Sequence, residues 1–413
     1  MKLQRISQVA VFYEPCPDRR IKVGRLALKA RRVLFEYDAA FLGTRLELSP
    51  FHLRLAPGVV EGQPKVLEGL MGVFDDSLPD GWGRLLIDRR ATERGLSGAS
   101  LTALDRLTLV GHRSMGALLY EPEAALDDPS IVKLSDLAMD AEAVQSGVRG
   151  ADLDRLVAVG GSPKGARPKV LIQLAPNGEM RFGARNIDPG FTGWLVKFPA
   201  REDDPQSASL EHAYFLMAKA AGLDVPRTQL LAKAKGRAGY FAIERFDRKG
   251  STRVHMHTLG GLLQLPHGYP ALDYRDVLKA TRDLTRNEAA VSEMFRRACF
   301  NVFAHNRDDH SRNFAYLMDG EGTWTPSPAY DLTFSEGPGG EHTTLIVGEG
   351  RRPSAEHLVA LAADVGLKKK SAKIVDEVRA AVADFKRFAD QAGVPARLRA
   401  EIAKALSLAN RSS

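Results

Sequence analysis

Cysteine is scarce in this sequence, and long apolar runs are missing from it. Its two cysteines, Cys16 and Cys299, form neither a metal-ligand spacing nor a disulfide framework. We therefore expect a reducing, cytoplasmic compartment. No apolar run of signal-peptide length follows the first residues, and no stretch approaches the length of a membrane span. These absences argue against a secreted or membrane-spanning protein, and we expect no membrane partner.

The composition is ordinary, without a strong excess of charge of one sign. The net charge is +7, while 44% of the residues are hydrophobic and 26% are charged. This mild basic excess suits an anionic partner such as a nucleotide phosphate or a nucleic acid, but it also suits a merely soluble surface. With 413 residues, the chain is long enough for two or three domains or lobes with sizeable cores.

Short β-branched and aromatic runs fill the front of the sequence, and helical patterns fill its back. The first predicted strands are Val9–Tyr13, Val23–Leu28, Arg32–Tyr37 and Phe51–Leu55. A hairpin is expected where the Asn177-Gly178 turn separates Pro168–Leu174 from Met180–Gly183. The longest predicted helices are Glu288–Phe303 and Lys370–Ala392. This order favours an α+β fold of two lobes, with a strand-rich front and a mainly helical back.

A dense polar segment separates the helix ending at Phe303 from a strand-like run that begins at Phe314. Within it, Asp308 and Asn313 have the Asp-x4-Asn spacing of a protein-kinase catalytic loop. That chemistry needs a carboxylate to orient a hydroxyl and an amide oxygen to hold Mg²⁺. A second metal carboxylate is expected at a later strand end, where Asp331 stands. The alternative is a loop whose Asp and Asn residues only cap and turn the chain.

A glycine-rich loop and a strand lysine precede this segment. The loop, Gly160–Lys169, lacks the Lys-Ser/Thr pair of a Walker A motif, yet its amides and its basic side chains suit phosphate oxygens. Lys197 lies inside an apolar strand, where it either faces solvent or meets an anion such as the phosphates of ATP. A lysine of the second kind needs a glutamate from the next helix, and Glu211 is the candidate.

Two further groups of residues leave alternatives open. The segment Glu244–Arg248 stands where a kinase hinge meets adenine and ribose, but it is equally typical of a salt-bridge cluster at a strand end. His255, His257, His305 and His310, together with Asp308 and Asp309, raise the alternative of a metal-dependent phosphohydrolase. That alternative is disfavoured because the adjacent pair runs Asp309-His310, in the reverse order, and no His-x-His pattern supports it.

Seven segments together resemble the HipA family, the kinase toxins of HipA–HipB type II toxin–antitoxin modules. They are Ser77–Gly83, Met115–Leu118, Gly161–Lys169, Leu195–Pro199, Glu244–Arg248, Asn306–Asn313 and Tyr330-Asp331. The resemblance covers most of the chain in the family's order. It implies an ATP- and Mg²⁺-dependent serine/threonine protein kinase with an atypical two-lobed kinase-like fold.

The resemblance also assigns roles to individual residues. Asp308 would be the catalytic carboxylate, and Asn313 and Asp331 would be the magnesium ligands. The residues implied to contact ATP are Gly161, Ser162, Lys164, Gly165, Lys169, Lys197, Glu211, Glu244, Phe246 and Asp247. On this basis we divide the chain into a β-rich subdomain at 1–125, an ATP-binding lobe at 126–250 and a helical catalytic lobe at 251–413.

Regulation and partners follow from the same resemblance. Ser162 matches the family's autophosphorylation serine, where a phosphate would compete with ATP and switch the kinase off. Relatives phosphorylate aminoacyl-tRNA synthetases and thereby arrest translation. The expected partner is a HipB-like helix-turn-helix antitoxin, which would tie the kinase to operator DNA. A second hypothesis is a catalytically quiet nucleotide-binding or DNA-tethered regulator on the same fold.

Overall fold

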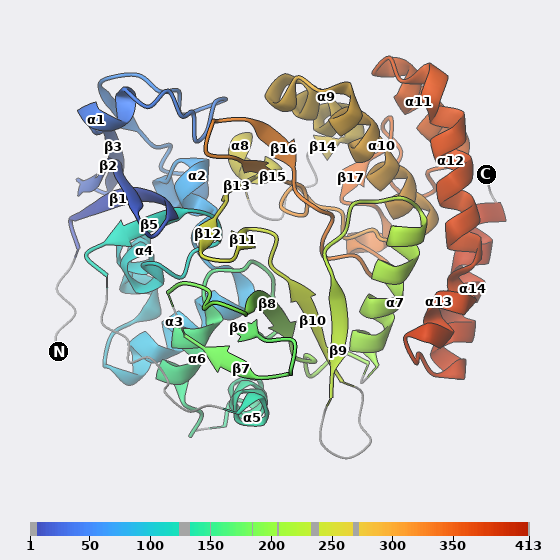
Figure 1. Ribbon diagram of the computed structural model, residues 1–413, viewed down its shortest axis with the longest axis horizontal. Helices are drawn as coiled ribbons and strands as arrows, with labels where there is room; N and C mark the ends of the chain where they lie inside the picture. The colour runs from blue at the N-terminus through green and yellow to red at the C-terminus, as the bar shows by residue number, and fades with distance from the viewer. Residues whose placement is uncertain are drawn as a thin grey trace. The chain divides into compact units, whose positions relative to one another are not determined.

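The structure is a computed structural model that describes residues 6–123, 133–148, 150–183, 185–204, 206–232, 239–266 and 272–411. The chain forms two compact units, each assembled from three separate segments (Figure 1). The first unit comprises Met1–Asp203, Ala242–Pro266 and Leu317–Thr323. The second comprises Asp204–Phe241, His267–Tyr316 and Trp324–Ser413. The expected boundary at 125/126 lies outside the described residues, so the three-part division stays a prediction.

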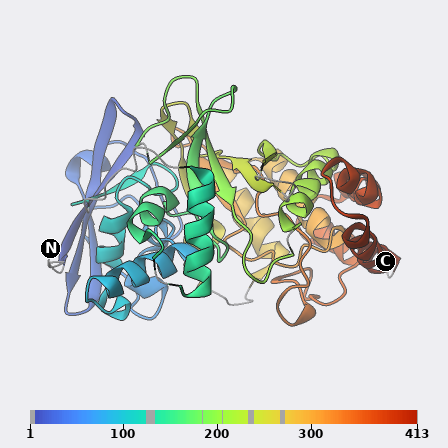
Figure 2. The same cartoon turned by 90° about the horizontal axis from the view of Figure 1, so that it is seen from below.

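An antiparallel sheet in the order β4-β3-β2-β1-β5 begins the first unit. Its strands are β1 (Gln8–Cys16), β2 (Arg19–Lys29), β3 (Arg32–Tyr37), β4 (Val59–Glu61) and β5 (Leu118–Glu121). Alternate residues of β1, among them Val9, Val11 and Tyr13, are buried because side chains along a strand point to opposite faces. Helices of the same unit lie along one face of the sheet (Figure 2).

Those helices are short, and several have polar caps. They are α1 (Ala39–Leu42), η1 (Leu67–Gly69), α2 (Gly72–Asp75), α3 (Gly81–Glu93), η2 (Gly98–Ser100), α4 (Ala103–Val110), α5 (Leu134–Ser146) and α6 (Leu153–Gly160). Thr102 and Asp105 form a reciprocal capping box that begins α4. Residues of α4 pack against β1 and β5, which brings the segment after α4 to the edge of the sheet.

A second antiparallel sheet in the first unit carries the glycine-rich loop. The strands of this sheet that lie entirely within the first unit are β6 (Lys169–Leu174), β7 (Met180–Phe182) and β8 (Thr192–Lys197), in the order β7-β6-β8. The predicted hairpin is confirmed by the pairing of β6 with β7. The chain passes from the second unit into the first along β10 (Tyr240–Glu244). It then forms β11 (Arg248–Lys249), β12 (Thr252–Arg253), β13 (His255–Thr258) and α8 (Leu259–Leu262).

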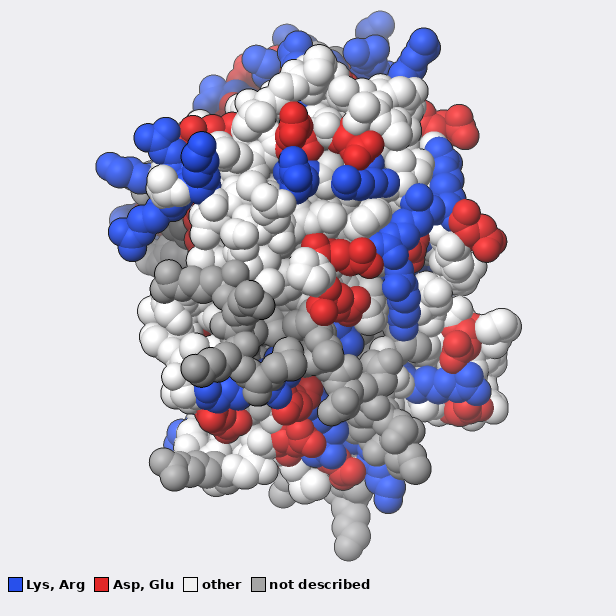
Figure 3. All heavy atoms as spheres, turned by 90° about the vertical axis from the view of Figure 1, so that its left-hand side faces the viewer, with Lys and Arg blue, Asp and Glu red and all other residues white. Residues whose placement is uncertain are grey.

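Strands β2, β3 and β4 of the first sheet carry charges of both signs. Ion pairs join Lys22 to Asp38 at 3.2 Å and Arg32 to Glu61 at 3.3 Å. Figure 3 shows the molecule from the left-hand side of Figure 1, and basic and acidic side chains are interspersed on this face. On the part of this face that is described, the basic excess of the chain is not gathered into one patch.

The second unit is mainly helical. Its elements before the polar segment are α7 (Ser207–Ala220), β9 (Thr228–Leu231), β14 (Leu272–Asp273), α9 (Tyr274–Thr285) and α10 (Glu288–Phe303). After it follow β15 (Ala315–Met318), β16 (Trp324–Pro326), η3 (Pro338–Gly340), β17 (Thr344–Leu345), α11 (Ala355–Asp364), α12 (Lys368–Ala383), α13 (Phe385–Gln391) and α14 (Ala396–Arg411). Helix α10 packs against α9, α11, α12 and α14, so apolar side chains surround it.

Two expectations about elements need correction. The run Phe51–Leu55 is not a strand but a turn, in which the amide of the buried Leu53 donates to the carbonyl of Ser49 at 3.0 Å. Pro50 within that turn has no amide hydrogen for a sheet ladder. The predicted helix Lys370–Ala392 is two helices, α12 and α13, separated at Asp384. Among the described residues, no helix is both long and apolar enough to cross a membrane.

Candidate active site

The glycine-rich loop follows α6 and rests on the start of α3, in the same unit. The amide of Gly165 donates to the carboxylate of Asp80, and the amide of Trp82 donates to the carbonyl oxygen of Gly165 at 3.1 Å. Gly81 has a φ of +36°, and a Cβ there would lie 2.7 Å from the carbonyl oxygen of Gly165. A glycine is therefore required for the two backbones to approach this closely.

Two side chains of the loop are held by residues distant in sequence. Ser162 is fully buried, and its Oγ accepts a hydrogen bond from the amide of Met115 at 2.9 Å. The Nζ of Lys164 donates to the carbonyl oxygen of Asp75 at 2.9 Å and lies 3.4 Å from its carboxylate. The loop is thus fixed in one conformation with its serine hydroxyl enclosed.

Lys169 and Lys197 face one another across β6 and β8. They are paired residues in the antiparallel register, so their side chains leave the same face of the sheet. Lys169 is 5% exposed, and its Nζ donates to the carbonyl oxygen of Lys164. Contacts of this pair with the phosphates of a nucleotide stay a prediction.

The segment after β10 is organised around a buried carboxylate. The oxygens of Asp247 accept hydrogen bonds from Arg245 at 2.9 and 2.8 Å, from Arg248 at 2.6 Å and from the amide of Gly116 at 2.8 Å. Burial acts to raise the pKa of Asp247, but Arg245 and Arg248 outweigh it and hold this pKa well below its usual range. Glu244 and Phe246 beside it are half-buried. Contacts of these residues with adenine or ribose stay predictions.

The polar segment of the second unit divides two adjacent aspartates between different environments. Asp308 is exposed, with 53% of its side chain open to solvent, and its carboxylate lies 4.0 Å from Nε2 of His310. Asp309 is fully buried and accepts hydrogen bonds from Tyr274 Oη at 2.9 Å and from the amide of Thr343 at 2.9 Å. The buried aspartate anchors the loop, and the exposed one is presented from it.

Further hydrogen bonds fix the ends of this loop. The Nδ2 of Asn313 donates to the backbone carbonyl of Asp308 at 2.7 Å, and its amide donates to the carbonyl of His310 at 2.8 Å. These bonds join the two ends of the predicted Asp-x4-Asn motif. The side-chain Nδ2 of Asn313 is used to hold the loop. The side-chain oxygen of Asn313 remains the group that suits a hard cation.

Asp331 lies on a neighbouring segment of the same unit. The hydroxyl of Tyr330 donates to the carbonyl of Arg312 at 2.5 Å, which ties the residue before Asp331 to the residue before Asn313. Asp331 has a φ of +56°, in the left-handed region that is uncommon for residues other than glycine. Carboxylate and amide oxygens form a donor set that Mg²⁺ prefers, so the residue types fit the expected ion.

The predicted site residues fall into two groups. The loop residues, Lys197 and the segment 244–247 belong to the first unit, and Asp308, Asn313 and Asp331 belong to the second. Glu211, on α7 of the second unit, is 2% exposed, and its pairing with Lys197 stays a prediction. Among the described residues, His, Cys, Asp and Glu side chains form no group of three that could hold a metal ion, as the phosphohydrolase alternative would need.

Sequence reasoning missed the residues that support these groups. Asp75 and Asp80 hold the glycine-rich loop, although Asp75 was not singled out and Asp80 was noted only within the segment Ser77–Gly83. Asp309 was considered only as a metal ligand of the alternative enzyme, whereas it anchors the polar loop. The available signal for Asp80 was the run Asp80-Gly-Trp-Gly83, which is itself rich in glycine.

Comparisons with known proteins identify relatives of this chain. A curated relative from Sinorhizobium fredii, named "Putative kinase Y4dM", is 28% identical over 251 residues, which are 54% of this chain and 60% of the relative. A similarly named kinase from Haemophilus influenzae is 30% identical over 154 residues, which are 34% of this chain and 45% of the relative. The chain thus spans about half the length of the curated relatives it matches.

A solved structure matches nearly the whole chain. It is the toxin–antitoxin system of Shewanella oneidensis MR-1, with HipA, HipB and operator DNA. The match has a TM-score of 0.67 and 18% identity, and it covers 94% of this chain and 93% of the other. The expected α+β fold is thereby confirmed.

Family models describe the same relationship. The model of the HipA N-terminal domain matches residues 19–121, and the model of the HipA-like C-terminal domain matches residues 161–385. The second match alone spans more than half of the chain and includes the glycine-rich loop, both lysines and the polar segment. The chain therefore belongs to the HipA family.

Proposed function

We propose that this protein is an ATP- and Mg²⁺-dependent serine/threonine protein kinase that acts as the toxin of a HipA–HipB type toxin–antitoxin module. The observation that carries the proposal is the difference in environment between the adjacent carboxylates of Asp308 and Asp309. One carboxylate is exposed and the next is locked in place by hydrogen bonds. A kinase needs such a rigidly placed carboxylate to orient a substrate hydroxyl.

The remaining residues supply positioning and electrostatic stabilisation. Lys169 and Lys197 leave the same face of the sheet, and their ammonium groups bind the phosphates of ATP. Asn313 and Asp331 supply the oxygen ligands for Mg²⁺, which neutralises charge on the phosphates when it is bound. Asp308 holds the acceptor hydroxyl and receives its proton. The protein thus contributes mainly geometry and charge to the transfer.

Autophosphorylation of Ser162 is the proposed off-switch. Its hydroxyl is fully buried against the amide of Met115. A phosphate with nearly two negative charges does not fit in that enclosed position, so the loop must leave its present conformation to become and remain phosphorylated. Its contacts with Asp80 and Asp75 would break at the same time, and the loop could no longer hold ATP.

The partners are proposed from the family and from the Shewanella assembly. That solved structure contains HipA with HipB and operator DNA. We propose a HipB-like helix-turn-helix antitoxin for this chain, with operator DNA bound mainly through the antitoxin. An aminoacyl-tRNA synthetase is the proposed substrate in the cytoplasm, and its phosphorylation would inhibit translation.

Transfer of labelled γ-phosphate from ATP–Mg²⁺ tests the kinase proposal. We expect label on wild-type Ser162 and a loss of at least about 100-fold in rate for Asp308→Asn and for Asp331→Asn, the range typical of a removed proton acceptor or metal ligand. Asp283→Asn, an exposed change on α9, is the matched control and should keep full activity. Chelation of Mg²⁺ should silence every variant.

Mass spectrometry of the purified protein must first establish whether Ser162 already carries a phosphate. If unphosphorylated wild type binds ATP tightly but transfers no label to itself or to added synthetase, the catalytically quiet regulator is the better description. Transfer that persists in Asp308→Asn would contradict the assigned role of this carboxylate.

A further inference from the structure

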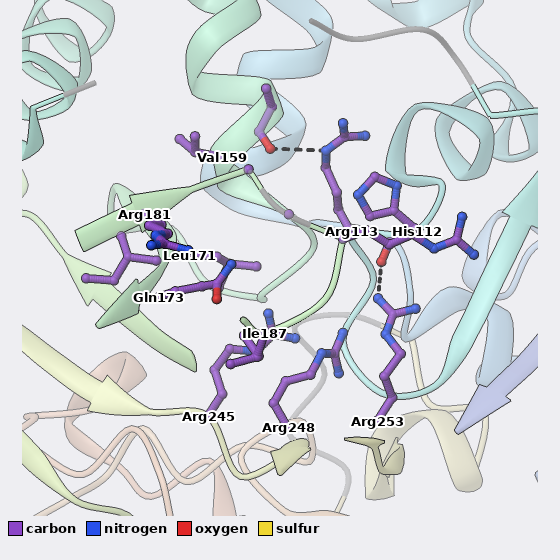
Figure 4. A pocket seen from close by; sticks show the side chains of 15 residues that line it. His112, Arg113, Val159, Leu171, Gln173, Arg181, Ile187, Arg245, Arg248 and Arg253 are labelled. Carbon is purple, nitrogen blue, oxygen red and sulfur yellow. Dashed lines mark hydrogen bonds between the residues drawn. The ribbon is translucent and has the colours of Figure 1, made fainter. Parts of the chain in front are cut away.

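A small pocket in the first unit is lined by an unusual number of arginines (Figure 4). The basic residues around it are His112, Arg113, Arg181, Arg185, Arg245, Arg248 and Arg253. Its interior space is about 50 Å³, against roughly 10–15 Å³ for one water molecule. A tetrahedral oxyanion fits such a space.

The positive charge around this pocket is only partly balanced. Among its buried arginines, Arg113 pairs with Glu123 at 3.0 Å, while Arg245 and Arg248 share Asp247. Arg253 is 3% exposed and makes no ion pair with a carboxylate in the described part of the chain. Arg253 is thus a buried guanidinium without an ion pair of its own, although the buried carboxylate of Glu14, which pairs with Arg185 at 2.7 Å, also favours its charged form. Buried charges without counter-charges are costly, and an anion in the pocket would supply the missing charge.

Hydrogen-bond donors are left over at the same place. Arg253 donates from one terminal nitrogen to the carbonyl of His112, and its Nε and other terminal nitrogen are buried with no hydrogen-bond partner. His112 bonds Glu123 through Nδ1 at 2.6 Å, while its buried Nε2 has no partner. Buried polar atoms are normally satisfied. Figure 4 shows Arg245, Arg248 and Arg253 rising from one side toward Gln173 and His112.

The titration behaviour of the arginines agrees with a surplus of positive charge. Burial and the charge of Arg245 together lower the pKa of Arg253 to about 10, against the opposing effects of Asp247 and Glu14. Burial and Arg245 also hold the pKa of Arg248 well below its usual range. A bound dianion would raise both, because opposite charge favours the protonated guanidinium.

We propose that this pocket binds a small, diffusible oxyanion of the phosphate class, at a site separate from the lysines assigned to ATP. Arg253, with its free guanidinium edge, is the central contact, and Arg248 and Arg245 are its neighbours. Guanidinium groups recognise phosphate oxygens through paired, charge-assisted hydrogen bonds. Binding at this site does not depend on the proposed kinase activity.

The pocket also connects to the segment that encloses Ser162. Arg248 donates to the carbonyl oxygens of Ser114 at 3.0 Å and of Gly116 at 2.9 Å. The residue between them, Met115, donates its amide to Ser162. An anion that fixes Arg248 therefore stiffens the backbone that holds the serine hydroxyl, and amide exchange at residues 114–116 should slow when the site is filled.

Calorimetric titration of the full chain with inorganic phosphate tests this site. The protein carries Ser162→Ala, so the added phosphate is the only one present. We expect binding of one phosphate with a Kd of about 1 mM or tighter, and weakening of about tenfold or more in Arg253→Gln, because a charge-assisted contact is lost. Sulfate should compete with phosphate, and chloride should not.

Three further variants keep the outcome clear. Arg25→Gln, an exposed change on β2, is the matched control and should bind as the parent does. Arg185→Gln, at the half-exposed rim, should weaken binding even if Arg253→Gln fails to fold. Lys197→Ala should leave phosphate binding unchanged. Loss of binding in Lys197→Ala with full binding in Arg253→Gln would place phosphate at the lysines and overturn the proposal, as would no binding at all.

Discussion

At the scale of single residues, a buried histidine links folding to pH. His255 lies on β13 and is fully buried, with its Nε2 donating to the carbonyl of Leu48 at 3.0 Å. Burial, with a smaller contribution from the nearby ring of His257, lowers its pKa from 6.5 to about 4, against the opposing effects of Leu48 and Asp76. The folded protein thus keeps this ring neutral at a pH where the unfolded chain would protonate it.

The first unit should accordingly lose stability in mild acid. Because the pKa of His255 is depressed in the folded protein, the unfolded state binds more protons than the folded state between pH 6.5 and 4. The free energy of unfolding therefore decreases as the pH is lowered through this window, and it levels off below pH 4. Between pH 7 and 5 we expect a loss of about 2 kcal/mol from this one group. Urea unfolding followed by circular dichroism at the two pH values measures it.

His255→Gln retains a donor for the carbonyl of Leu48 but does not titrate. Its free energy of unfolding should therefore fall by about 2 kcal/mol less than that of the wild type between pH 7 and 5. His52→Gln, at an exposed position, is the matched control and should behave as wild type does. Equal losses in wild type and His255→Gln would show that other groups cause the acid sensitivity.

At the scale of elements, the start of α3 supports the glycine-rich loop through direct contacts. Gly81, Trp82 and Asp80 contact Gly165 through backbone and carboxylate bonds. The conformation of the loop is therefore set by a helix some eighty positions earlier in the sequence. This dependence explains why the loop departs from known phosphate-binding motifs and yet remains ordered.

Gly81→Ala should dislodge the loop. Its Cβ would lie 2.7 Å from backbone atoms of Gly165 and Ala166, and we expect a loss of about 1–3 kcal/mol from this overlap. Hydrogen exchange should become faster at the amide of Gly165. Gly95→Ala is the control, because Gly95 also has positive φ but has nothing within 4 Å of its Cβ position. Unchanged hydrogen exchange at the loop in Gly81→Ala would show that α3 does not hold the loop in place.

Sequence patterns predicted local elements better than their pairings. The helix Glu288–Phe303 is confirmed at both ends, because its apolar residues recur over four turns and Asn287 caps it. The spacing of Asp308 and Asn313 predicts a catalytic role for the polar loop, and that role stays a prediction. Which aspartate is buried could not be predicted, because the partners of Asp309, Tyr274 and Thr343, are distant in sequence. The register that opposes Lys169 to Lys197 depends likewise on how two strands align.

At the scale of the whole molecule, the first unit depends on residues from the later part of the chain. Asp76 accepts hydrogen bonds from His257 at 2.6 Å and from the amide and hydroxyl of Thr258 at 2.7 Å each. Asp247 similarly orders the backbone at Gly116. Residues 242–266 therefore satisfy buried polar groups of the segment 1–203.

A fragment of residues 1–203 should unfold at a lower urea concentration than the full chain, with β6 and β8 unprotected from hydrogen exchange. Unpaired buried carboxylates at sites such as Asp76 are the physical reason. Joining residues 242–266 to this fragment through a flexible linker should restore protection. Equal protection in both fragments would show that the later segment is dispensable.

The interleaving of the two units has a consequence for synthesis on the ribosome. The first unit is complete only when residue 323 has been made, after the polar loop that carries Asp308. At the usual rates of translation, the stretch from residue 203 to residue 323 takes on the order of ten seconds. During this time the strands bearing Lys169 and Lys197 lack part of their surroundings, so the nascent chain exposes apolar surface. A newly made molecule is thus open to chaperones and proteases before either unit is complete, and its folding yield should respond to the speed of elongation.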